Sequence, residues 1–117
     1  MSPKRGDRVA PPPDPGGWDV RFATNEACKG WDQLCRQAAA NTLKAWTALR
    51  TRPDNPIPTP RHHRLKGRLA SALHGGADME QWQIEVTGAG RIWYLVDPAN
   101  RILWIRLATT GHPAETD

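Results

Sequence analysis

The last third of the chain constrains the fold most, because it holds three closely spaced β segments. Residues 82–86 read WQIEV, residues 91–96 read RIWYLV and residues 101–108 read RILWIRLA. β-branched and aromatic residues favour strands, and the Gly-Ala-Gly and Asp-Pro-Ala-Asn segments between them are typical of turns. Connections this short join antiparallel neighbours. The sequence therefore predicts an antiparallel sheet in this part of the chain.

The first half of the chain predicts a strand followed by helix. Residues 18–22 alternate apolar and polar side chains, as in a strand with one buried face. A helix is expected to begin near Asn25, its predicted N-cap, and to continue as one helix or as two if Asn41 interrupts it. The residues expected on its buried stripe are Trp31, Leu34, Cys35, Ala38, Leu43, Trp46 and Leu49. Four prolines in residues 51–60 predict an extended connector. Residues 61–73 are expected to form one more strand, and residues 74–78 (HGGAD) a turn.

The order strand, helices, strands predicts an α+β domain with an antiparallel sheet of three to four strands. The helices would cover one face and leave the other open to solvent or a partner. We expect residues 18–117 to form this single domain. Residues 1–17 are rich in proline, glycine and charge, so we expect them to be a disordered leader.

The composition indicates the cellular compartment in which the protein is expected. No apolar run approaches the ~20 residues of a membrane helix, and the N-terminus lacks the apolar segment of a secretion signal, so we expect a cytoplasmic protein with no membrane partner. Cys28 and Cys35 would lie ~10 Å apart on a helix, too far for a disulfide. We expect both cysteines in the core, with no metal ion and no cofactor, because no histidine stands at ligand spacing near them.

The charge is concentrated in one segment. The chain carries a net charge of +4 with a pI of about 9.6, which suits a polyanionic partner. Residues 61–68 read RHHRLKGR, with four fixed cations, two histidines and no acid. A solvated surface turn is the alternative interpretation of this run.

Side-chain alternation predicts what the uncovered face displays. Ile84, Ile92, Leu103, Ile105 and Leu107 are among the residues expected to face the helices. A three-residue loop at 88–90 would pair Thr87 with Arg91 and Glu85 with Trp93. The residues expected on the open face are Glu85, Arg91, Trp93, Trp104 and Arg106. Cations mixed with aromatic rings are typical of surfaces that bind single-stranded nucleic acid, whereas an amphipathic face with structural Arg–Glu pairs is the alternative.

Three strings, in this order and spacing, resemble the RelE/ParE toxin superfamily: HHRLKG (62–67), GRIWYLVD (90–97) and TTGHP (109–113). The resemblance covers roughly residues 18–113. Members of that family are toxins of bacterial toxin–antitoxin modules. RelE-like members cleave mRNA in the ribosomal A site, and ParE-like members act on DNA gyrase. The resemblance implies an antitoxin, mRNA and the ribosome as partners.

The resemblance also implies roles for individual residues. It places His63, Arg91 and His112 in the catalytic site, and Arg61, Arg64 and Lys66 against RNA. Trp93 and Arg106 would extend the RNA-binding surface on the open face.

These residues predict a metal-independent endoribonuclease, because RNA supplies its own 2′-hydroxyl nucleophile and needs only a base, an acid and a cation. Arg91 would stabilise the phosphorane, His112 would protonate the leaving oxygen, and His63 would be the base, with Glu85 as the second choice. Two alternatives stay open: a ParE-like gyrase inhibitor, and a non-catalytic module that binds RNA or an antitoxin.

Overall fold

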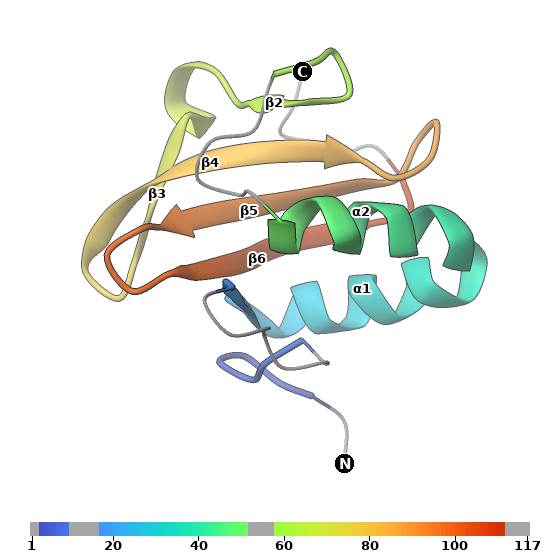
Figure 1. Ribbon diagram of the computed structural model, residues 1–117, viewed down its shortest axis with the longest axis horizontal. Helices are drawn as coiled ribbons and strands as arrows, with labels where there is room; N and C mark the ends of the chain where they lie inside the picture. The colour runs from blue at the N-terminus through green and yellow to red at the C-terminus, as the bar shows by residue number, and fades with distance from the viewer. Residues whose placement is uncertain (1–2, 10–16, 52–57, 112–117) are drawn as a thin grey trace.

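The computed structural model describes residues 3–9, 17–51 and 58–111, which form two helices and a six-stranded sheet (Figure 1). The elements follow in the order β1 (Asp19–Phe22), α1 (Asn25–Gln37), α2 (Ala39–Thr51), β2 (His62–Arg64), the 3-10 helix η1 (Gly67–Leu69), β3 (Ser71–His74), β4 (Ala77–Glu85), β5 (Arg91–Asp97) and β6 (Ile102–Thr109). This order confirms the α+β class. No helix in the described ranges is long and apolar enough to cross a lipid bilayer.

The sheet is larger than predicted and is mixed rather than antiparallel. Its strands lie in the order β1-β6-β5-β4-β2, with β3 also paired to β4. β1 runs parallel to β6, whereas all other pairs are antiparallel. The prediction of one strand over residues 61–73 was wrong, because Gly67 adopts a positive φ of 60° that turns the chain out of β2. The predicted 74–78 turn is a tight hairpin in which Gly75 and Gly76 both have positive φ.

Both helices cover the same face of the sheet (Figure 1). Thr24, not Asn25, is the N-cap of α1, because its Oγ1 accepts a hydrogen bond from the Ala27 N–H at 3.0 Å. The helices separate at Ala38, three residues before the predicted break at Asn41. Leu43 is 62% exposed, so its predicted place on the buried stripe was wrong, because the buried side of α2 is formed by Thr42, Ala45, Trp46 and Leu49.

The two cysteines differ in their surroundings. Cys28 is buried and Cys35 is exposed, and both are free thiols. The prediction that both lie in the core was therefore wrong for Cys35.

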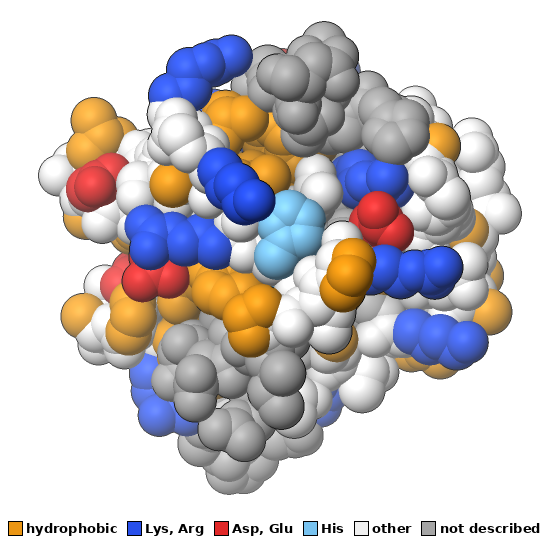
Figure 2. Space-filling model, turned by 90° about the horizontal axis from the view of Figure 1, so that it is seen from above, with side chains coloured by type: hydrophobic (Ala, Val, Ile, Leu, Met, Phe, Trp, Pro, Cys, Tyr) orange, Lys and Arg blue, Asp and Glu red, His pale blue; other side chains and the backbone are white. Residues whose placement is uncertain are grey.

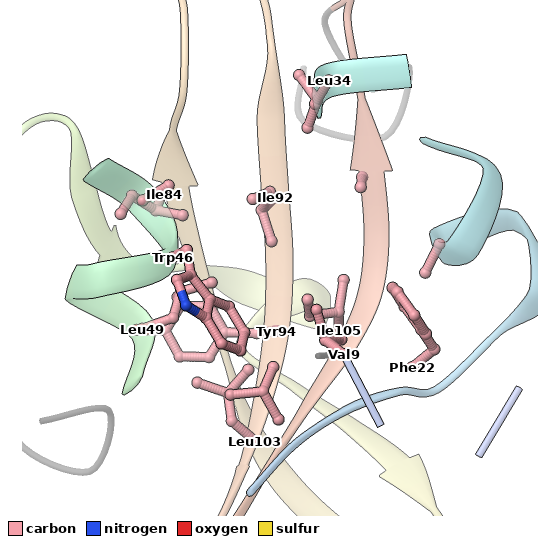
Figure 3. Close-up of a cluster of buried hydrophobic side chains, with 14 of the residues drawn as sticks. Val9, Phe22, Leu34, Trp46, Leu49, Ile84, Ile92, Tyr94, Leu103 and Ile105 are labelled. Carbon is pink, nitrogen blue, oxygen red and sulfur yellow. The ribbon is translucent and has the colours of Figure 1, made fainter. Parts of the chain in front are cut away.

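The core lies between the helices and the sheet (Figure 3). Trp46 and Leu49 of α2 pack over Tyr94 and Leu103, while Leu34 of α1 packs at the other end of the sheet. The inward prediction is confirmed for Ile84, Ile92, Leu103 and Ile105.

Leu107 is the exception, because a β-bulge shifts the register of β6. Tyr94 pairs with Ile105 but Trp93 pairs with Leu107, so Arg106 is the extra residue. Beyond the bulge, Ala108 takes the inward position instead of Leu107. The prediction that Leu107 faces the helices was wrong for this reason.

Residues 3–9 lie along β1, although we expected them to belong to a disordered leader. Val9 and Val20 are hydrogen-bonded through their backbones, as are Asp7 and Phe22, and the Val9 side chain is buried in the core. Residues 1–2 and 10–16 of the expected leader lie outside the described residues.

Candidate nucleic-acid interface

The strand register places Glu85, Arg91, Trp93 and Trp104 on the face of the sheet opposite the helices, here called the outer face. Glu85 pairs directly with Arg91, and Gln83 pairs with Trp93. The predicted pairing of Glu85 with Trp93 was wrong by two residues. The Val86 N–H bonds to the Gly90 carbonyl, so the loop spans residues 86–90 and not 88–90. A shift of two residues leaves every side chain on its predicted face.

The outer face is covered at its centre, so the prediction of an open face was wrong. Trp93 is 0% exposed, and its indole N–H donates to Gln83 Oε1 at 2.8 Å. Gln81, also buried, donates to the Leu69 carbonyl of η1 at 2.8 Å, which places η1 over this face. The Trp93 ring is therefore not available for stacking on a base.

β3 packs against β6 on the outer face. The His74 ring lies against Trp104 with ring centroids 4.2 Å apart. Arg106 donates to Gln81 Oε1 at 3.2 Å and is only partly exposed. Trp104 and Arg106 thus lie on the outer face as predicted, but both are engaged in packing the β3 hairpin against the sheet.

Arg91 lies on the outer face but is 6% exposed. Its Nη1 donates to the carbonyls of Thr87 at 3.1 Å and Gly90 at 3.0 Å, and its Nη2 lies 3.1 Å from Glu85 Oε1. Both Nη atoms also approach the Gly88 carbonyl. These contacts hold the guanidinium against the β4–β5 loop. They agree with the alternative interpretation, in which Arg91 forms a structural Arg–Glu pair.

The two histidines of β2 point to opposite faces. His62 pairs with the inward Ile84, and its Nε2 lies 2.6 Å from the hydroxyl of the buried Tyr94. Burial, and secondarily the neighbouring His63, lowers the pKa of His62. Burial also raises the pKa of Tyr94, so its hydroxyl stays protonated. His62 is therefore an anchor for β2.

His63 pairs with Gln83 and so lies on the outer side of the sheet edge, half-buried. Its Nδ1 contacts only the Arg64 carbonyl, at 3.0 Å, among the described residues. Glu85 lies two residues along from Gln83 on the same face, and its backbone N–H bonds to the Arg61 carbonyl. The Cα atoms of His63 and Arg91 are two strands and two residues apart, roughly 12 Å at ordinary sheet spacings.

One group of exposed positive charges lies along β2 and η1. Its four exposed side chains, here called the basic edge, are Arg61, Arg64, Lys66 and Arg68. The side chains of Lys66 and Arg68 form no hydrogen bond or ion pair in the part of the chain that the structure describes. Figure 2, seen from the β2 side, shows Lys and Arg side chains around a histidine, with acidic side chains among them.

The side chains of Arg61 and Arg64 differ in how many contacts they make. Arg61 is 86% exposed and only approaches Glu85 Oε2, at 3.9 Å. Arg64 donates to the Ala70 carbonyl and the Ser71 hydroxyl, both at 3.0 Å, so it also shapes the chain around η1. Sequence reasoning assigned no role to Arg68, although its place in the 61–68 run was the available signal.

The structure brings Glu85 together with Arg91 and Arg61, and it places His63 opposite Gln83, two residues along β4 from Glu85. His112 lies outside the described residues. Among the described residues, no group of three or more His, Cys, Asp or Glu side chains is arranged to hold a metal ion. Comparisons of the chain with family models, curated proteins and solved structures gave no match.

Proposed function

We propose that this chain is a RelE/ParE-like toxin that binds single-stranded mRNA along the basic edge and cleaves it by attack of the RNA 2′-hydroxyl. One observation supports the proposal most directly: four exposed cations lie on one sheet edge beside a half-exposed histidine and a carboxylate. The strand-helix-helix-strand order and the three strings at 62–67, 90–97 and 109–113 support the toxin family. The target and the antitoxin would be cytoplasmic.

The basic edge would hold the RNA backbone. Each phosphate contact releases counterions, so clustered free cations favour binding of a polyanion. Arg61, Lys66 and Arg68 have guanidinium or ammonium groups free to take phosphate oxygens. Arg64 keeps η1 in place so that Lys66 and Arg68 project from it.

The chemistry would use His63 as the group that accepts the 2′-hydroxyl proton, which leaves Glu85, the second choice for this role, to contact the RNA. RNA supplies the nucleophile, so the protein needs to accept the 2′-hydroxyl proton and to neutralise charge on phosphorus. Arg61, exposed beside Glu85, is better placed for a phosphate than the buried Arg91. We therefore assign Arg91 the part of a positioning residue that holds Glu85 and the loop. His112 stays the proposed acid, in a segment outside the described residues.

Inducible expression with mapping of transcript ends in the ribosome-bound pool tests this function. We expect wild-type expression to stop growth and to give new transcript ends, and His63→Ala to lose both while remaining folded. Lys66→Gln combined with Arg68→Gln should also reduce cleavage. The matched control is Lys29→Gln with Arg36→Gln, which removes two exposed cations from α1.

Intact transcripts together with broken chromosomal DNA would contradict the proposal and favour the gyrase inhibitor. RNA binding without any cleavage in the presence of ribosomes would favour the alternative of a non-catalytic module that binds RNA or an antitoxin.

A further inference from the structure

A cleft of about 250 Å³ lies between α2 and the edge of β4, next to the basic edge. Its apolar walls come from Ala45, Ile84 and Val86. Four polar side chains also line it: Asn41 and Lys44 from α2, Arg61, and Glu85. Its volume is below the roughly 300–1,000 Å³ of pockets for drug-sized ligands, so it suits a ligand no larger than one nucleotide.

The polar side chains of the cleft have unused hydrogen-bonding capacity. Asn41 and Lys44 are exposed and form no hydrogen bond or ion pair within the described residues. Glu85 uses Oε1 for Arg91 at 3.1 Å, while Oε2 has only the 3.9 Å approach of Arg61. The cleft therefore offers two cations, one amide and one carboxylate oxygen to a ligand.

We propose that this cleft binds one nucleotide of the RNA strand. This inference rests on the proposed function and specifies how the strand is seated. Lys44 and Arg61 carry the charge that a phosphate requires, and Ile84 and Val86 offer an apolar surface for a base. The carboxylate oxygen of Glu85 and the amide of Asn41 bind the edge of the base.

The carboxylate requires a donor on the base. Glu85 can only accept hydrogen bonds when ionised, and Oε2 is the oxygen that Arg91 leaves open. Each base offers a donor, which is an exocyclic amino group in guanine, adenine and cytosine and the ring N3–H in uracil. The cleft is therefore expected to bind all four nucleotides.

NMR titration of the full chain with GMP, AMP, CMP, UMP and inorganic phosphate tests the cleft. The Asn41 carboxamide and the Lys44 backbone amide are the reporting signals. We expect both to shift with all four nucleotides. Lys44→Met should weaken nucleotide binding about tenfold, the effect of one charge-assisted hydrogen bond. Asn41→Ala should weaken GMP binding and leave phosphate binding unchanged.

Lys29→Met is the matched control, because it removes one exposed lysine from α1, and it should bind nucleotides as the wild type does. The nucleotide-binding role of the cleft would be overturned if the Asn41 and Lys44 signals stay unshifted with every nucleotide at millimolar concentration while RNA still binds through Lys66 and Arg68. The proposed function would not be affected by that result. Nucleotide binding by a chain that binds no RNA would overturn the proposed function and, with it, an RNA nucleotide as the occupant.

Discussion

The guanidinium of Arg91 contacts backbone carbonyls and a carboxylate at the end of one β hairpin. A charged group with this little exposure is stable only while these partners remain. Sequence alternation placed Arg91 correctly on the outer face. It could not show that the carbonyls of Thr87, Gly88 and Gly90 would turn toward the guanidinium, because backbone orientation in a loop is not encoded in polarity.

Arg91→Ala should destabilise the fold by about 2–4 kcal/mol, because it removes several hydrogen bonds to a charged donor and one partner of Glu85. Urea unfolding measures the change. Arg68→Ala, an exposed arginine without a partner in the described part of the chain, is the control and should stay within about 0.5 kcal/mol of wild type. Wild-type stability of Arg91→Ala together with complete loss of cleavage would instead assign Arg91 a direct role in catalysis.

His62 should make stability depend on pH. Burial lowers its pKa in the folded chain, so the unfolded chain binds more protons in the window between the folded pKa and the usual ~6.5. Stability is therefore complete above that window and falls as the pH drops through it. Urea midpoints between pH 8 and pH 5 should fall for the wild type and fall less for His62→Gln.

His63→Gln removes a histidine from the same strand while keeping the burial of His62 and its hydrogen bond to Tyr94, so it should retain most of the acid-side decline, since burial is the larger cause of the lowered pKa. An equal decline in His62→Gln would show that other groups cause the pH dependence.

At the scale of elements, α1 and β6 approach each other closely. A Cβ on Gly30 would lie 1.7 Å from the carbonyl oxygen of Ala108, on the residue that the β6 bulge turns inward. This contact could not be predicted from the sequence, since the bulge comes from tertiary packing and Gly30 stands inside a regular helical pattern. The alternation up to Ile105 could be predicted because nothing interrupts the strand there.

Gly30→Ala should therefore cost about 2 kcal/mol or more, although alanine normally favours helix, because α1 must move away from β6. Thermal unfolding measures the loss. Gly88→Ala is the control, since a Cβ at that position meets open space and should have little effect on stability. A stabilised Gly30→Ala chain would contradict this packing of α1 on β6.

At the scale of the whole molecule, the chain divides into a helix-covered face, a partly covered outer face and a basic edge. The α+β class and the charge of the 61–68 run follow from local sequence patterns. The cover over Trp93 does not, because it depends on Gly67 turning the chain and on Gln81 reaching Leu69. The candidate RNA-binding surface is therefore an edge of exposed cations and not the aromatic surface that the sequence predicted.

The salt dependence of RNA binding measures the basic edge most directly. Single-stranded RNA binding should weaken with a log–log slope that becomes shallower by about 1.4 in Lys66→Gln with Arg68→Gln, at about 0.7 for each lost phosphate contact. Lys29→Gln with Arg36→Gln removes the same charge from α1 and should leave the slope unchanged. Equal slopes for all three chains, or no RNA binding by the wild type, would contradict a basic edge that holds RNA.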